Sequence, residues 1–252
     1  MATLSFRYTR YSKYKECILV SKRTWIIFAA ICAVVLGGLV YLSGKDKIDV
    51  SDVNTNSIIS ASEKSGNIAD HVFGKRDSKV ILVEYGDYQC PGCGSLYPRL
   101  KTLSEKYEGQ IAFVFRNFPL TTIHPNARAA AAVAESAGLM GKYWEMHNLL
   151  YENQDKWKDL TSTERTDVFV GYAKQLGLNE TTFKDNLSKA EINQKISFDQ
   201  ALGKKLNITG TPSIYLDGTE VKQDTWASDD SFDKAIQAEL KKNGIELPKT
   251  DS

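Results

Sequence analysis

Two cysteines stand close enough along the chain to react with each other. Cys90 and Cys93 are separated only by a proline and a glycine, in the order C-P-G-C. A disulfide between them would close too small a loop to cross-link distant parts of a fold, so it would stabilise the protein little. The other two cysteines, Cys17 and Cys32, both lie near the N-terminus. The spacing therefore favours thiol–disulfide chemistry over a structural cross-link.

The segments on either side of the pair predict a strand and a helix. Residues 79–85, with the sequence KVILVEY, have the composition of a buried strand, and residues 86–89 follow as a turn. Beyond the pair, apolar residues recur at helical spacing: Leu96, Leu100, Leu103 and Tyr107. We therefore expect Cys90 to lie where a buried strand leads into the first turn of a helix.

This position gives the two thiols different roles. Pro91 suits the first helical position, because its missing N–H would have no helical partner there in any case. Backbone N–H groups and the positive end of the helix dipole would then face the sulfur of Cys90 and favour its thiolate. We expect Cys90 to be the nucleophile and Cys93, one turn into the helix, to be the shielded resolving thiol.

The motif resembles the active-site sequence of a known family. The run VILVEYGDYQ followed by CPGC, with the sequence GTPS far downstream at residues 210–213, is similar to the DsbA family of thiol:disulfide oxidoreductases. The resemblance implies an α/β fold of the thioredoxin type. It also implies a cis peptide bond between Thr211 and Pro212 that faces the cysteine pair. An extended substrate segment could then pair with the main chain of Thr211 while its sulfur reaches Cys90.

Glu84 is a third candidate site residue. It is the only acidic residue in the apolar run and lies six residues before Cys90. In thioredoxin-like proteins this position carries a buried carboxylate beneath the cysteine pair, and the resemblance implies the same here. Burial would raise its pKa, and it could accept the proton of Cys93 while a mixed disulfide is resolved. The alternative is a glutamate at the strand end that points into solvent.

A long helical segment separates this first part of the fold from Pro212. Helices are predicted over residues 126–138 and 142–152, and a third begins at the capping box of residues 161–164. DsbA-like proteins insert a helical subdomain here, and the resemblance implies one over about residues 124–205. We therefore predict a thioredoxin-like fold with an inserted helical subdomain.

Charge is sorted about an apolar segment near the N-terminus. The whole chain has a formal net charge of +1, which excludes a globally basic nucleic-acid binder. Residues 1–24 hold six basic residues and one acidic residue. Residues 25–42 contain neither a charge nor a proline and approach the roughly 20 residues of a membrane-spanning helix. The positive-inside rule then places the N-terminus in the cytoplasm and the rest of the chain outside.

These features predict four parts. They are a cytoplasmic basic tail over residues 1–24, one transmembrane helix over 25–42, a flexible polar linker over 43–65 and a DsbA-like thioredoxin domain over 66–248. A cleaved signal peptide is the alternative, but its apolar region is usually shorter and ends in small residues. We expect a single-pass protein of the cell membrane with an extracytoplasmic catalytic domain, and a monomer.

The predicted function is that of an anchored thiol:disulfide oxidoreductase that introduces or exchanges disulfides in exported proteins containing cysteine. The resemblance implies recycling by a membrane quinone-linked thiol oxidase of the DsbB or vitamin K epoxide reductase type. We expect no cofactor. We also expect no bound metal, because the three histidines are too far apart in the sequence for a local metal motif.

Several alternatives remain open at this stage. Pro91-Gly92 lacks the histidine that the most oxidising family members carry, so a reductase or isomerase role stays possible. Cys90 and Cys93 could instead be the ligands of an extracytoplasmic copper or zinc chaperone. The domain could also be a tethered interaction module with an inert disulfide, or a redox domain that serves one dedicated membrane protein.

Overall fold

The structure of the protein is a computed structural model that describes residues 22–45 and 48–248. It divides the chain into two units, residues 1–47 and 48–252. Residues 1–21 of the predicted basic tail lie outside the described residues. Each unit is considered by itself.

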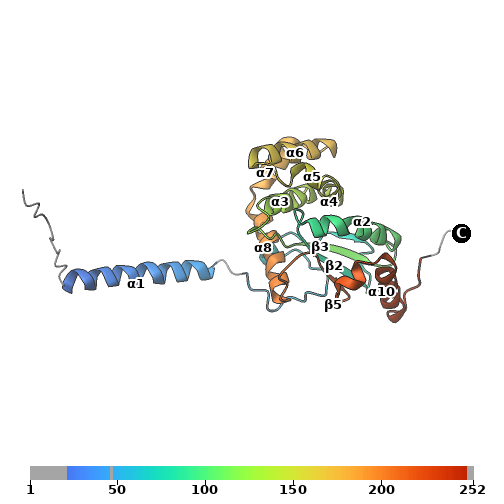
Figure 1. Ribbon diagram of the computed structural model, residues 1–252, viewed down its shortest axis with the longest axis horizontal. Coiled ribbons are helices and arrows are strands. Elements are labelled where there is room, and N and C mark those ends of the chain that lie inside the picture. Colours follow the sequence, from blue (N-terminus) through green and yellow to red (C-terminus); the bar gives the residue numbers. More distant parts are fainter. Residues whose placement is uncertain (1–21, 46–47, 249–252) are drawn as a thin grey trace, which may run out of the picture. The chain divides into compact units, whose positions relative to one another are not determined.

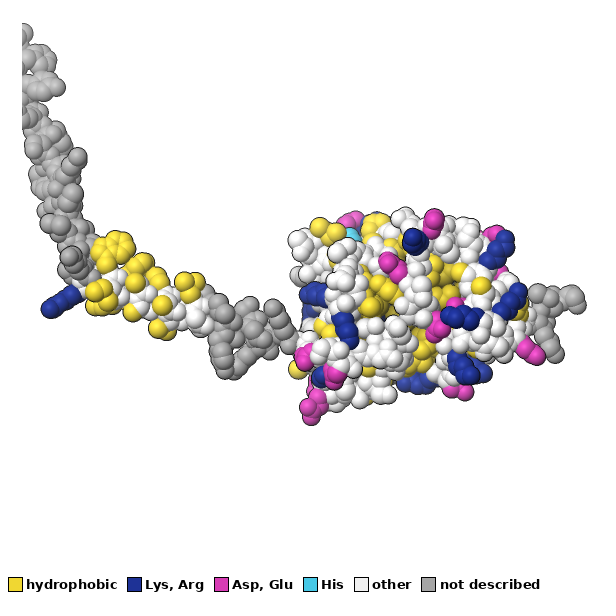
Figure 2. Space-filling view, turned by 90° about the horizontal axis from the view of Figure 1, so that it is seen from below, with side chains coloured by type: hydrophobic (Ala, Val, Ile, Leu, Met, Phe, Trp, Pro, Cys, Tyr) yellow, Lys and Arg dark blue, Asp and Glu magenta, His cyan; other side chains and the backbone are white. Residues whose placement is uncertain are grey.

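The described part of the first unit is one helix, α1 (Lys22–Lys45). Apolar side chains are exposed along it, as Figure 2 shows. In the part of the chain that the structure describes, no helix combines the length and the hydropathy that crossing a membrane requires.

The second unit is built on a mixed β-sheet (Figure 1). Within residues 48–248, the sheet has five strands in the order β1-β3-β2-β4-β5. The strands are β1 (Val72–Gly74), β2 (Ile81–Gly86), β3 (Ala112–Asn117), β4 (Ser213–Leu216) and β5 (Thr219–Val221). β2 and β3 are parallel, and the other neighbouring pairs are antiparallel. A parallel pair needs a crossover between its strands, and the helix that begins after Cys90 provides it.

Helices cover both faces of the sheet. Successive side chains of β2 point to opposite faces, so neighbouring residues of this strand pack against different helices. Leu82 packs in one cluster with α2 and α10, whereas Val83 packs in another with α8. The helices concerned are α2 (Pro91–Lys106), α8 (Ala190–Lys205) and α10 (Asp229–Lys242). By the same alternation, Glu84 shares the face of Leu82 and lies on the side of α2.

The remaining long helices come between β3 and β4 in the chain. They are α3 (Ala127–Gly138), α4 (Tyr143–Glu152), α6 (Ser162–Gln175) and α7 (Glu180–Leu187), and α8 follows them. The short helices are η1 (Glu63–Ser65), α5 (Gln154–Trp157) and α9 (Gln223–Trp226). The capping box expected at the start of α6 is present, since Thr161 and Glu164 each accept from the other's backbone N–H.

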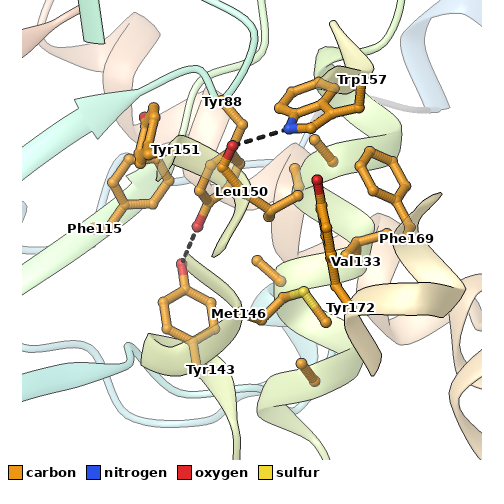
Figure 3. Close-up of a cluster of buried hydrophobic side chains, with 14 of the residues drawn as sticks. Tyr88, Phe115, Val133, Tyr143, Met146, Leu150, Tyr151, Trp157, Phe169 and Tyr172 are labelled. Atoms are coloured by element: carbon orange, nitrogen blue, oxygen red, sulfur yellow. Dashed lines mark hydrogen bonds between the residues drawn. The ribbon is translucent and has the colours of Figure 1, made fainter. Parts of the chain in front are cut away.

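A buried cluster of large side chains joins these helices to the sheet (Figure 3). The indole Nε1 of Trp157 donates to the carbonyl oxygen of Leu150 at 2.9 Å, and the hydroxyls of Tyr88 and Tyr143 are 3.5 Å apart. Tyr88 lies two residues before Cys90. Packing in the helical insert therefore fixes the loop that leads to the cysteine pair.

Residues 48–65 differ from the flexible linker that their polar composition predicts. Val50 is buried in the core on the α8 side of the sheet. The guanidinium of Arg116, which is fully buried, donates to the carbonyl oxygens of Thr55 and Ser57, each at 2.7 Å, and to Asp70 at 2.8 Å. The segment is held through its main-chain carbonyls, so its side-chain composition gives no sign of the contact.

We predict that Arg116→Met lowers the free energy of unfolding by about 3–5 kcal/mol, because it leaves Asp70 with one buried cation fewer and two carbonyls without their donor. Chemical denaturation of the full chain in detergent measures this. The double variant with Asp70→Asn should cost less than the sum of the two single changes. Additive losses would contradict the coupling of the two side chains.

Candidate active site

The cysteine pair lies at the junction of the sheet and α2. Cys90 is the N-cap residue of α2 and Pro91 is its first helical residue, as the sequence predicts. Both cysteines are free thiols, so the structure shows the reduced pair. Cys90 is 7% exposed and Cys93 is fully buried. Of the two sulfurs, only that of Cys90 is open to a partner.

The segment at the start of β4 faces the pair. The peptide bond between Thr211 and Pro212 is cis, as the resemblance implies. The Sγ of Cys90 lies 3.4 Å from the carbonyl oxygen of Thr211. A Cβ atom at Gly92 would come within 3.3 Å of the Pro212 ring. Residues more than 110 positions apart in the sequence thus form one surface around the Cys90 sulfur.

The surroundings separate the acidities of the two thiols. The pKa of Cys90 is lowered to about 5, first by the hydrogen bond from Cys93 and then by Thr211 and the backbone N–H groups of Gly92 and Cys93, against the opposing effect of its burial. Burial, and the hydrogen bond to Cys90, raise the pKa of Cys93 well above its ordinary value. At neutral pH Cys90 is therefore the thiolate and Cys93 keeps its proton.

Glu84 is buried beneath the pair, with 2% of its surface exposed, and does not point into solvent. Burial, and then the charge of Cys90, raise its pKa to about 8, while a hydrogen bond with Cys93 acts in the opposite direction. Its Oε1 atom has no hydrogen-bond partner among the described residues. A carboxyl group whose pKa is close to the ambient pH can both take up and release a proton.

The histidines are bonded elsewhere. His71 lies 2.9 Å from Glu135, His124 lies 2.7 Å from Asp87, and Nδ1 of His147 lies 3.0 Å from the Tyr88 hydroxyl. Within the described residues, no group of three or more histidine, cysteine or acidic side chains is arranged to hold a metal ion.

Gln154 is a site residue that the sequence did not indicate. From α5, its Nε2 donates to the carbonyl oxygens of Tyr88 at 2.7 Å and of Cys90 at 3.0 Å. A Cβ atom on Gly94 would lie only 2.6 Å from the Gln154 Oε1, so the glycine leaves the space that this amide occupies. Gln154 therefore fixes the main chain of the nucleophile from the helical insert.

A second amide contact ties the same loop to the insert. The Gln89 side chain accepts from the backbone N–H of Asn126 and donates to the carbonyl oxygen of Lys158, both at 2.6 Å. The Asn126 side chain donates to Lys158 as well, at 2.9 Å. Both the oxygen and the nitrogen of the Gln89 side-chain amide are therefore hydrogen-bonded, and Gln89 directly precedes Cys90.

The lowered pKa of Cys90 predicts the pH dependence of its alkylation. The rate of reaction with iodoacetamide should rise with pH through a midpoint near 5, because the thiolate is the reacting form. Cys93→Ala should move the midpoint up, since it removes the largest stabilising contact. A midpoint near the ordinary value of about 8.5 in the unchanged protein would contradict this assignment.

Gln154→Ala should lower the free energy of unfolding by about 1–3 kcal/mol, because buried carbonyls lose their donor. Gly94→Ala should also destabilise, since the new Cβ collides with the amide. In the double variant the shortened side chain makes room for the Cβ, so we expect a smaller loss than the sum, measured by denaturation. Simple additivity would show that the two residues do not share this space.

Known proteins resemble this arrangement in sequence and in structure. The pattern of a family described as Thioredoxin matches residues 66–238. A probable disulfide bond formation protein D of Bacillus cereus is 30% identical over 223 residues, which cover 86% of this chain and 95% of that protein. The crystal structure of oxidised BdbD from Bacillus subtilis has 28% identity and a TM-score of 0.60, covering 73% of this chain and 98% of that one.

A third match covers only part of a longer protein. The Na(+)/H(+) antiporter NhaA 1 of Salinispora arenicola is 36% identical over 149 residues, which are 59% of this chain and 22% of the antiporter. The chain therefore spans about a fifth of that relative. The family match and the relative aligned over nearly its whole length agree with the fold and with the C-P-G-C motif, and the chain belongs to the thioredoxin family.

Proposed function

We propose that this protein exchanges disulfides with exported proteins through Cys90 and Cys93, with Glu84, Thr211 and Pro212 completing the site. The difference in acidity between the two thiols is the observation that carries the proposal: the pKa of Cys90 is lowered and that of Cys93 is raised. A metal chaperone or an inert interaction module would not need one reactive and one protected thiol. The name of the relative in Bacillus cereus, a probable disulfide bond formation protein, supports the same activity.

The reaction starts from the oxidised pair. A substrate thiolate attacks the Sγ of Cys90, the Cys90–Cys93 bond breaks, and Cys93 leaves as a thiolate that takes the proton of Glu84. A second substrate thiolate then attacks the substrate sulfur of the mixed disulfide and releases Cys90 as a thiolate. The substrate is oxidised by two electrons and the pair is reduced.

The main chain beside Cys90 orients the substrate in this scheme. The carbonyl of Thr211 lies within hydrogen-bond reach of the Cys90 sulfur. An extended substrate segment that pairs with the main chain of Thr211 would bring its own sulfur to that point. Recognition through backbone groups suits an enzyme that acts on many sequences.

The stabilised thiolate favours the oxidising direction. An environment that lowers the pKa of Cys90 stabilises the reduced pair, so the disulfide form becomes the stronger oxidant. Turnover then needs an oxidant for the reduced pair. We propose a membrane quinone-linked thiol oxidase of the DsbB or vitamin K epoxide reductase type as that partner.

We also propose that residues 25–42 anchor a single-pass protein with its N-terminus in the cytoplasm and its catalytic domain outside. The support is the uncharged apolar sequence of this segment and the excess of basic residues before it. The protein should stay in the membrane fraction after alkaline carbonate extraction. Release into the supernatant would contradict the anchor.

A second candidate is a redox domain that serves one dedicated membrane protein. The match to part of an antiporter sequence favours it, because there a similar segment belongs to a longer membrane protein. The number of proteins that form mixed disulfides with Cys90, which we call its clients, distinguishes this candidate from general disulfide exchange.

Cys93→Ala in the full chain should accumulate mixed disulfides at Cys90 in cells: the Cys90 thiolate attacks a disulfide of a substrate and releases one substrate thiolate, and without Cys93 the variant has no second thiol to break the bond that forms. Non-reducing electrophoresis and mass spectrometry would identify the clients. Many exported proteins would support general exchange, and a single membrane protein would support the dedicated role. Adducts that persist when Cys90→Ser is added would contradict the assignment of the nucleophile.

A further inference from the structure

Asp87 lies three residues before Cys90, and its carboxyl group accepts three hydrogen bonds. The side chain is fully buried. Oδ1 accepts from the backbone N–H of Gln89 at 2.7 Å, and Oδ2 accepts from the backbone N–H of Leu120 at 2.8 Å. The third partner is His124, whose Nδ1 lies 2.7 Å from Oδ2. We call these three contacts the Asp87 clasp.

The Asp87 clasp joins two loops that follow neighbouring strands. The pairing of β2 with β3 ends at Gly86 and Asn117. Leu120 and His124 lie in the loop between β3 and α3, so the clasp continues the connection beyond the sheet. A carboxylate can only accept, and the bond that a ring nitrogen makes decides where the proton of the imidazole sits. Nδ1 of His124 is therefore the donor in this contact.

The main chain of Asp87 contacts both cysteines. Its carbonyl oxygen accepts from the backbone N–H of Cys90 at 3.0 Å. Burial, and then the hydrogen bond to Cys90, raise the pKa of Cys93, whereas a backbone hydrogen bond from Asp87 lowers it. A backbone group that lowers the pKa of a thiol donates its N–H to the sulfur, because this bond favours the thiolate.

In the proposed reaction, Cys93 leaves the disulfide as a thiolate at a fully buried position. The electron pair of the broken Cys90–Cys93 bond goes to the Cys93 sulfur before the proton of Glu84 neutralises it. Charge that develops at a buried atom is stabilised best by a donor that is already in position. The N–H of Asp87 is such a donor as long as the main chain of residue 87 cannot turn away.

We propose that His124 is a positioning residue: through the Asp87 carboxylate, it holds the main chain of residue 87 so that its N–H meets the charge on Cys93 when that thiol leaves the disulfide. The inference rests on the proposed function and adds to it a residue from outside the cysteine motif. Without the ring, the carboxylate loses its side-chain donor, and the turn before Cys90 is held less firmly to the loop after β3.

The direct test is the rate at which dithiothreitol reduces the Cys90–Cys93 disulfide of the full chain in detergent, since Cys93 must leave in this step. Alkylation of quenched samples and mass spectrometry follow the reaction. His124→Ala should slow reduction by about five- to tenfold, the size expected from weakening one hydrogen bond. His124→Asn should restore most of the rate, because its side-chain amide can donate from near the position of Nδ1.

His71→Ala is the matched control. It breaks another contact between a half-buried histidine and a buried carboxyl group, that of His71 with Glu135 at 2.9 Å, which joins the residue before β1 to α3. This variant should be reduced at the unchanged rate. Alkylation of Cys90 in reduced His124→Ala places no charge on Cys93, so its rate should change by less than twofold.

Reduction of folded His124→Ala as fast as that of the unchanged protein would overturn the proposal. Equal slowing in His71→Ala would overturn it as well, because general loosening of the domain would then explain the effect. If His124→Ala does not fold, His124→Gln takes its place, since its longer side chain carries the amide beyond the position of Nδ1 and should leave reduction slow. The proposed function fails separately, if Cys93→Ala traps no substrate.

Discussion

The hydrogen bond from the Cys93 thiol to the Cys90 sulfur is the contact on which the rest of the site depends. It is the largest cause of the lowered Cys90 pKa, and the same contact helps to keep the proton on Cys93. One negative charge is thus shared between two sulfurs one helical turn apart. Burial is the main cause of the raised pKa of Glu84, and the negative charge at Cys90 raises this pKa further.

The fold keeps this contact in place from several directions. β2 carries Glu84 beneath the pair, and the cis segment before β4 brings Thr211 beside the sulfur. The helical insert adds Gln154, whose side-chain amide donates to the carbonyl oxygen of Cys90. The insert therefore supports the geometry of the nucleophile in addition to forming a surface of its own.

The sequence predicts those parts of the site whose signal is local. The C-P-G-C motif, the strand before it and the helical stripe after it indicate where Cys90 lies, and a lone acid in an apolar run marks Glu84. Gln154 escapes this reasoning, because it bonds main-chain carbonyls 64 and 66 residues away, and a carbonyl carries no residue-type signal. The same holds for residues 48–65, whose partner is the buried Arg116.

The reduction potential of the full chain against glutathione, with the Cys90 thiolate titrated in the same sample, tests the central claim most directly. Stabilisation of the thiolate by Cys93 predicts a potential clearly more positive than the roughly −270 mV of thioredoxin, towards the roughly −120 mV of DsbA, with a thiolate midpoint near 5. A potential near −270 mV, with Cys90 titrating near about 8.5, would contradict it.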